Sequence, residues 1–374
     1  MNPIPALPAS RIDATELYSI WKSTKLTASQ ALQKAINTAI TNLEKKGIVS
    51  VQLYNGEVDY YPNDPSNYLI SSKLRGGELL SKSEYKENFF IVQAGSLARG
   101  TLMPGADIDF LVFPSNEKSR PYTQALQREV RFALKEIIGN NKLPFKVDEI
   151  MTEEINFHVP PEEVEEKLLQ PKRKVYNAEF GMTWEELSIA SMVLRDIEFL
   201  YGDKDAFDQL VGESRDRLFT PHNCNDTVGI ELTRSLLEQP LRNGLAALGK
   251  GLSNESIINN FDPKDQGTRI IELFAWLIRT REGVKEKNPV DVIKATESLN
   301  KGEQEKLEEA FKFLIILSAA TRNANPAVRE GEHPKLTKQN EGKIASQLGV
   351  ETSLFRKALI DHLITMCKII PDYI

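Results

Sequence analysis

The spacing of hydrophobic and polar positions differs between the residues before about 183 and those after it. In residues 27–46 the apolar side chains recur every three or four positions, which is typical of an amphipathic helix. Ser29 is a suitable N-cap for this helix, and Gly47 a suitable residue just past its end. Two apolar runs follow at 89–94 and 108–113, separated by a segment rich in Gly, Ser and Thr. This arrangement predicts a strand, a turn and a second strand.

The other segments of the chain also have patterns that predict secondary structure. Residues 49–80 hold short β-rich pieces between turn residues, which predicts a hairpin and loops. Residues 122–138 have helical spacing, 144–151 have the composition of a strand, and the first thirty residues are where we expect least order. From residue 183 onward the strong patterns have the helical period, at 184–200, 229–248, 269–279, 303–320 and 342–348. The second part is therefore predicted to be helical.

These patterns predict an α+β protein with a small mixed sheet and helices, followed by an α-helical domain. A chain of 374 residues is also longer than one hydrophobic core usually organises. We predict an N-terminal helical extension with loops at 1–84, an α/β domain at 85–212 and a helical domain at 213–374.

Composition and charge favour a soluble globular protein over a membrane protein or a protein that binds nucleic acid in bulk. Hydrophobic residues make up 41% and charged residues 27%, as in soluble globular proteins, and the net charge of −6 argues against bulk nucleic-acid binding. The N-terminus lacks the basic region of a signal peptide, and the longest apolar stretch, 313–320, is far shorter than the roughly 18 residues of a membrane span. We expect a cytoplasmic protein with reduced thiols and no membrane contact. The sequence leaves the oligomeric state open.

The candidate chemistry lies between residues 95 and 112. Side chains alternate along a strand, so Asp107 and Asp109 are expected to project from one face with Cα atoms roughly 6.5 to 7 Å apart. Paired carboxylates are hard oxygen ligands that suit Mg²⁺, with Mn²⁺ as the alternative. Transfer of a phosphoryl group from a nucleoside triphosphate depends on such cations to neutralise charge and align the reacting oxygens. We therefore predict Asp107 and Asp109 as catalytic residues and metal ligands.

The turn before the two carboxylates is predicted to bind the triphosphate. Glycine at position 95 permits close approach, and the hydroxyl of Ser96 with neighbouring backbone amides suits a phosphate group. Arg99 and Thr101 belong to the same segment and are included among the nucleotide-binding residues. A guanidinium matches phosphate oxygens, although a surface role for Arg99 is the alternative.

A third carboxylate is expected from a later strand. Asp148, in the apolar setting of residues 144–151, is the candidate, with Glu149 and Glu153 as competing choices. It would help hold the catalytic metal and accept a proton from the attacking hydroxyl.

The Gly-Ser turn, the following Gly100-Thr101 step and the Asp-x-Asp strand together resemble the DNA polymerase β-like nucleotidyltransferase superfamily. The closest branch by resemblance is the bacterial PII uridylyltransferase with its stand-alone relatives, over roughly residues 85–360. Three further segments carry this resemblance: 194–203 with its final Gly-Asp, 271–279 with Trp276, and 336–349.

The resemblance implies transfer of a nucleoside monophosphate from an NTP to a hydroxyl, with Mg²⁺ and release of pyrophosphate. It points to a protein acceptor, with tyrosine as a candidate, and to uridylylation or adenylylation. The uridylyltransferase motif Gly-Gly-Leu-Arg-Asp is replaced here by Gln266-Gly267-Thr268-Arg269-Ile270, so its Asp is missing. A His-Asp metal dyad is also missing from the sequence, so removal of the modification is not expected.

Two other functions remain open. The protein would add nucleotides to RNA or to small nucleotides if a basic groove lay beside the Asp109 strand. Alternatively, it would be a non-catalytic relative that binds nucleotide or a partner, which absent metal binding and absent pyrophosphate release would reveal. Trp184 and Trp276 lie on helical patterns and are expected in the core rather than against a base.

Overall fold

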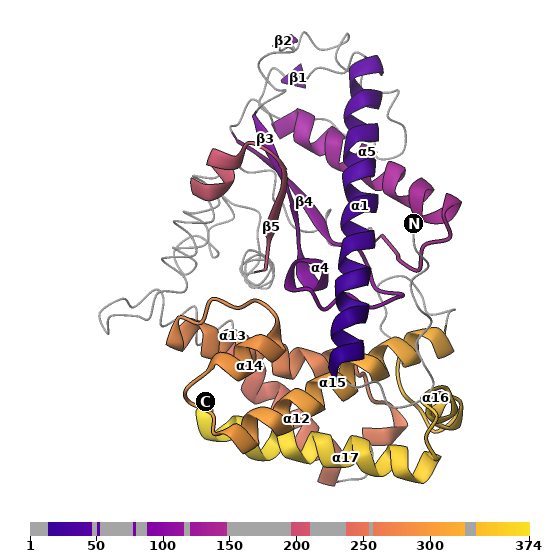
Figure 1. Ribbon diagram of the computed structural model, residues 1–374, viewed down its shortest axis with the longest axis vertical. Coiled ribbons are helices and arrows are strands. Elements are labelled where there is room, and N and C mark those ends of the chain that lie inside the picture. Colours follow the sequence, from indigo (N-terminus) through magenta and orange to yellow (C-terminus); the bar gives the residue numbers. More distant parts are fainter. Residues whose placement is uncertain are drawn as a thin grey trace. The chain divides into compact units, whose positions relative to one another are not determined.

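The protein forms two compact units, each built from segments that are distant in the sequence. The sheet unit comprises residues 26–98 and 107–216, and the helical unit comprises 1–25, 99–106 and 217–374 (Figure 1). The computed structural model describes residues 14–46, 51–52, 78–79, 88–115, 120–147, 196–209, 237–253, 257–325 and 334–374. Among these residues, none of the helices has both the length and the hydropathy that a membrane span requires.

Among the described residues, three antiparallel strands form the main sheet, in the order β4-β3-β5. The central strand β3 (Phe89–Gln93) pairs with β4 (Phe110–Pro114) on one side and with β5 (Glu198–Gly202) on the other. All five residues of β3 are buried. A central strand that is buried on both faces needs apolar side chains at successive positions, which explains the continuous apolar run in the sequence.

A second, two-residue pairing joins β1 (Val51–Gln52) to β2 (Glu78–Leu79) in antiparallel fashion. It confirms that strands pair across the region predicted as a hairpin with loops, while the residues between them lie outside the described part of the chain.

The sheet unit also contains residues 26–46 of the long helix α1 (Ala14–Lys46) and the helix α5 (Arg120–Asn140) (Figure 1). α5 packs against β4. The buried positions of α1 are mostly small or aliphatic and are inaccessible to solvent: Ala28, Ala31, Leu32, Ala35, Ile36 and Ala39. The helix predicted at 27–46 is thus confirmed, and α5 confirms the helix predicted at 122–138.

The start of α1 differs from the prediction. The helix begins at Ala14 rather than near Ser29, because the apolar spacing continues through the buried residues Leu17, Ile20 and Trp21. Ser29 is therefore inside the helix and is not an N-cap. The expectation of little order in the first thirty residues is wrong for residues 14–30.

Residues 198–202 form a strand, although the sequence predicted a helix through residue 200; residues 184–195 lie outside the described part. The open edge of β3 offers a full set of backbone partners, and this pairing overrides the local helical spacing. Gly202 ends β5 with φ +96°, and an added Cβ would lie 2.2 Å from the carbonyl oxygen of Phe89. Asp203 then accepts a hydrogen bond from the Ala206 amide at 3.0 Å and caps the helical turn 204–209.

The helical unit is an assembly of helices around one almost fully buried element. α13 (Arg269–Glu282) has buried side chains at every position from 270 to 280, and it packs against α12 and α14. Residues 99–106 and the first part of α1 also belong to this unit. The other described helices of this unit are α12 (Gln239–Ser253), α14 (Pro289–Ala295), α15 (Lys301–Ala324), α16 (Glu341–Gln347) and α17 (Thr352–Ile369), with the short turns η5 (Ile257–Asn259), η6 (Lys264–Thr268) and η7 (Ile370–Tyr373).

The predicted helices at 269–279, 303–320 and 342–348 are confirmed. Local capping explains where several helices begin and end. Asn288 caps α14 by accepting from the amide of Val290, Asn300 and Glu303 form a capping box at α15, and Gly283 ends α13 with φ +70°. α14 and α17 were not among the predicted helices.

Candidate active site

The chain enters the site from the buried end of β3. Gln93 is 4% exposed, accepts a hydrogen bond from the Ser29 hydroxyl at 3.0 Å and donates one to Glu198 at 2.6 Å. These two bonds connect α1, β3 and β5 at a single buried amide. Because a buried amide is costly to leave unpaired, the network fixes the strand immediately before Gly95.

The predicted turn is a one-turn helix, α4 (Gly95–Arg99). Gly95 has φ +55°, the left-handed conformation that glycine adopts most readily. Just before it, the Ala94 amide donates to the Asp109 carbonyl at 3.0 Å, so the segment stays paired with the strand that bears the carboxylates. Ser96 follows in the first turn of α4 and is partly exposed.

Asp107 and Asp109 lie in an extended segment that leads into β4, rather than on the short strand itself as predicted. Asp107 forms an isolated parallel bridge with Lys146, and the Ile108 amide donates to the Lys146 carbonyl at 2.9 Å. Ile108 and Phe110 are 2% and 3% exposed, whereas the two aspartates are partly exposed. This alternation places the two apolar side chains toward the core and both carboxylates on the opposite face.

The structure brings Gly95 and Asp109 into direct proximity. A Cβ added at Gly95 would lie 2.4 Å from Oδ2 of Asp109 and 3.3 Å from its carboxyl carbon. Any side chain at position 95 would therefore displace the carboxylate. The sequence suggested that glycine is needed for phosphate approach; the geometry adds that glycine makes room for a predicted metal ligand.

The donor set fits a hard divalent cation. Asp107 and Asp109 supply carboxylate oxygens, which are the ligands that Mg²⁺ prefers. Within the described ranges, no group of three or more His, Cys, Asp or Glu residues with metal-binding geometry occurs. Asp148, Glu149 and Glu153 lie outside those ranges.

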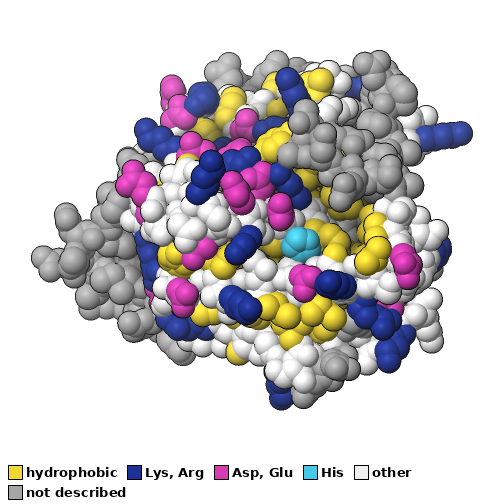
Figure 2. Space-filling model, turned by 60° about the horizontal axis from the view of Figure 1, so that its bottom comes forward, with side chains coloured by type: hydrophobic (Ala, Val, Ile, Leu, Met, Phe, Trp, Pro, Cys, Tyr) yellow, Lys and Arg dark blue, Asp and Glu magenta, His cyan; other side chains and the backbone are white. Residues whose placement is uncertain are grey.

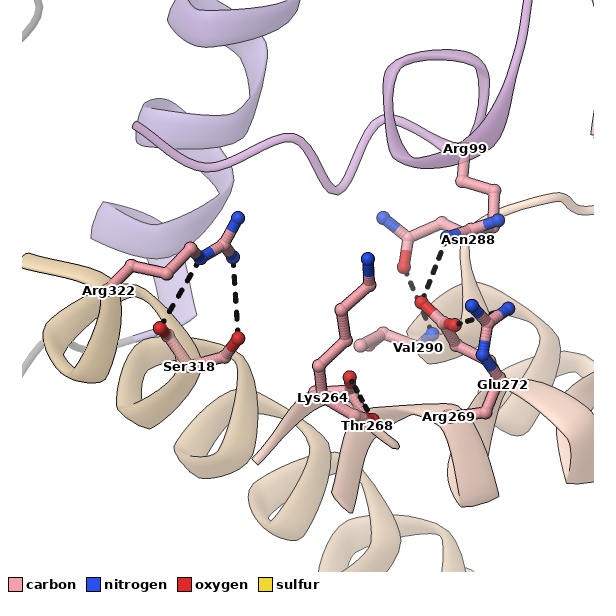
Figure 3. Close-up of polar contacts among 9 residues, drawn as sticks. All are labelled: Arg99, Lys264, Thr268, Arg269, Glu272, Asn288, Val290, Ser318 and Arg322. Atoms are coloured by element: carbon pink, nitrogen blue, oxygen red, sulfur yellow. Dashed lines mark hydrogen bonds and ion pairs between the residues drawn. The ribbon is translucent and has the colours of Figure 1, made fainter. Parts of the chain in front are cut away.

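Arg99 and Thr101 pack within the helical unit, unlike Gly95, Ser96 and the two aspartates, which belong to the sheet unit. Arg99 Nη2 donates to Glu272 Oε1 at 3.0 Å, and its guanidinium lies 5.6 Å from the centroid of the Trp276 ring (Figure 3). Thr101 is 2% exposed, and its hydroxyl has no hydrogen-bond partner among the described residues. Trp276 is 2% exposed, as expected of a core residue.

Sequence reasoning missed Glu272. Its signal is an acidic residue inside the otherwise largely apolar stretch of α13, three positions after Arg269. A charge at such a position requires a partner, because buried carboxylates are rarely left unpaired.

The motif and its geometry agree with the comparison with known families. Residues 78–184 match the family described as "Nucleotidyltransferase domain". The chain therefore contains a nucleotidyltransferase domain. The matched segment encloses the candidate residues from Gly95 to Asp148, and it supports transfer of nucleotidyl groups as the chemistry of the nucleotidyltransferase domain. No curated protein matches the chain.

The match does not cover every element of the sheet. It begins at β2 and ends before β5, and α1 lies wholly outside it. β5 and α1 therefore lie outside the segment that matches the family.

Proposed function

We propose that the protein transfers a nucleoside monophosphate from an NTP to a hydroxyl group on another protein and releases pyrophosphate. The observation that carries this proposal is the placement of Asp109 against Gly95, with Asp107 on the same face, inside the matched nucleotidyltransferase segment. This placement brings a proposed ligand of the cation next to the predicted phosphate-binding turn, which suits a reaction that depends on positioning and charge stabilisation.

Each residue has a distinct role in the proposed reaction. Asp107 and Asp109 would hold Mg²⁺, which would supply positive charge to neutralise the triphosphate. The Ser96 hydroxyl donates a hydrogen bond to a phosphate oxygen. Asp148, which is the proposed third carboxylate, accepts the proton of the attacking hydroxyl. A bond forms between the acceptor oxygen and the α-phosphorus, the bond to the bridging oxygen breaks, and pyrophosphate leaves.

A protein acceptor is favoured by the resemblance of residues 194–203, 271–279 and 336–349 to the uridylyltransferases. The net charge of −6 also disfavours a polyanionic acceptor. Figure 2 shows one face of the molecule on which Lys and Arg side chains are interspersed with Asp and Glu side chains. Such a mixture lacks the one-signed field that nucleic-acid surfaces use. The proposed modification is uridylylation or adenylylation of a protein hydroxyl.

The test is transfer of label from each of the four NTPs, labelled at the α-phosphate, with Mg²⁺ or Mn²⁺ in a cell lysate that supplies acceptors. We expect wild-type protein to release pyrophosphate and to label a protein band. The double variant Asp107→Ala with Asp109→Ala should lose at least about a thousand-fold in rate, because it lacks the ligands that bring the cation to the triphosphate.

The matched control removes two exposed carboxylates from the same unit, Glu136→Ala with Asp205→Ala, and should keep the wild-type rate. Label in RNA or in a small nucleotide would contradict a protein acceptor and favour nucleotide addition to RNA or small nucleotides. Release that survives in the Asp107 and Asp109 variant would refute the assignment of the site.

A further inference from the structure

Arg99 occupies a special place in the chain. It is the last residue of α4, whose first turn carries Ser96, and the first residue of the segment 99–106 that packs in the helical unit. A contact that restrains Arg99 therefore also restrains the C-terminal end of α4.

The Arg99 side chain is held by a buried ion pair. Its Nη2 lies 3.0 Å from Oε1 of Glu272, and the two side chains are only 9% and 10% exposed. Arg269 approaches the other carboxylate oxygen of Glu272 at 3.8 Å, so one carboxylate serves two guanidinium groups (Figure 3). A charge-assisted contact in such a dry setting is stronger and more restrictive than one at the surface.

Trp276 supports the same guanidinium. It lies one helical turn after Glu272 on α13, so the two side chains share a face of the helix. The guanidinium of Arg99 lies over its ring, and the buried indole nitrogen has no hydrogen-bond partner among the described residues. The contribution of Trp276 here is thus the ring itself, as packing surface and as a cation–π partner.

We propose that Arg99 is a positioning residue, and that Glu272 and Trp276 hold it so that the C-terminal end of α4, and with it the Ser96 turn, has a fixed geometry. This inference rests on the proposed function where it assigns Ser96 to the triphosphate. It differs from direct phosphate binding by Arg99, because moving the guanidinium to a phosphate would leave Glu272 buried without its nearest cation.

The two roles predict different outcomes in a double-mutant cycle of Arg99→Ala, Glu272→Ala and both together. If Arg99 acts through Glu272, each single variant lowers kcat/KM for the NTP by about ten- to a hundred-fold, as expected of a misplaced binding group, and the double variant loses no more. If Arg99 binds phosphate itself, Arg99→Ala raises KM while Glu272→Ala leaves it near the wild-type value. That second outcome overturns the proposal.

Hydrogen exchange does not depend on enzymatic activity, so it tests the role of Arg99 independently of the proposed function. We would measure backbone hydrogen exchange in peptides that cover residues 94–106, in wild type and in each variant. Both Arg99→Ala and Glu272→Ala should accelerate exchange there, because the end of α4 loses its restraint. Unchanged exchange in both variants overturns the inference even if the protein proves to be an active transferase. Accelerated exchange upholds it even if no transfer is found.

The matched control is another Arg–Glu pair of the helical unit. Arg356 donates to Glu341 at 2.9 and 2.6 Å, and Glu341 is 2% exposed. Glu341→Ala should leave hydrogen exchange in residues 94–106 and the KM for the NTP unchanged. Faster exchange in these residues would mean that the effect of Glu272→Ala reflects a general destabilisation of the helical unit. Should Glu272→Ala fail to fold, Glu272→Gln keeps an acceptor oxygen for Arg99 without the charge. It should give a smaller acceleration of the same peptides, and none at all would count against the proposal.

Discussion

Asp109 of the sheet unit and several glutamates of the helical unit are accommodated differently. In the sheet unit, Asp109 lies against the Cα of Gly95, where the missing side chain leaves room for it. Among the described residues of the helical unit, four glutamates are matched by basic side chains: Glu272 with Arg99 and Arg269, Glu308 with Lys294 and Lys312, Glu341 with Arg356, and Glu238 with Arg281. The first arrangement fits a group that must receive a ligand, and the second fits groups that hold helices together.

Glu308 illustrates the second arrangement. Burial alone would raise the pKa of this carboxyl, but hydrogen bonds from Lys312 and Lys294 outweigh burial and leave the pKa below its ordinary value. The carboxylate is therefore stabilised in its charged form by the fold itself. Asp109, beside Gly95, is the carboxylate proposed for chemistry, whereas Glu308 is stabilised by two lysines of the helical unit.

The largest effect is expected from breaking the first arrangement with Gly95→Ala. The added Cβ would meet Oδ2 of Asp109, and an alanine at φ +55° is strained by about 1 kcal/mol. We expect pyrophosphate release to fall by about a hundred- to a thousand-fold, because a misplaced metal ligand weakens transition-state stabilisation. Steady-state kinetics together with thermal unfolding would separate loss of activity from loss of stability.

Gly249→Ala is the control for this variant. Gly249 lies in α12 with no atom within 4 Å of an added Cβ, so alanine should preserve activity and stabilise the helix by roughly 0.5 to 1 kcal/mol. Wild-type activity in Gly95→Ala would show that the carboxylate does not need the space that glycine provides.

Gly202 contrasts with Gly95, because the atoms close to it are backbone atoms rather than a carboxylate. In Gly202→Ala the new Cβ would collide with the Phe89 carbonyl oxygen in the central strand, at a φ of +96°. We expect the free energy of unfolding to fall by about 3 kcal/mol, measured by denaturant titration. Gly139→Ala, near the end of α5 and with open space around it, should be neutral or slightly stabilising. Equal stability of the two variants would mean that β5 does not depend on this close approach.

The smallest effect concerns the second arrangement and appears as a dependence on pH. Because the pKa of Glu308 is lower in the folded than in the unfolded protein, its contribution to stability is present at neutral pH and is lost as pH falls through the folded pKa. Glu308→Gln cannot titrate, so it should be less stable than wild type at pH 7 and should approach wild type in acid. Thermal melts between pH 7 and pH 3 would test this; a difference that is constant with pH would contradict the assignment.

The parts of the fold that the sequence predicts are those determined by local pattern. The strand, turn and strand around Gly95 follow from a buried central strand and an alternating Asp pair, and α13 and α15 follow from helical spacing with caps at their ends. The nucleotidyltransferase chemistry was predicted from the same short segment, which the family match supports. The third carboxylate Asp148, the metal and the three-part division of the chain stay predictions.

The parts that sequence reasoning missed depend on partners far away along the chain. β5 is a strand because it pairs with β3, more than a hundred residues earlier, and its short apolar run is ambiguous between helix and strand. The pairing of Arg99 with Glu272 spans 173 positions. A guanidinium next to a Gly-Ser turn suggests phosphate when considered alone, and only the fold reveals the carboxylate that it contacts.

The place of β5 in the sheet has a consequence for how the protein is made. β3 and β4 leave the ribosome well before β5, so the central strand first presents an unpaired edge of backbone N–H and C=O groups. The candidate carboxylates Asp107 and Asp109 are therefore synthesised early, but β5 pairs with β3 only after Gly202 has been added. A fragment that ends with the matched residues would keep that edge open and be prone to pair with other chains. The shortest fragment with an intact sheet extends at least through Gly202.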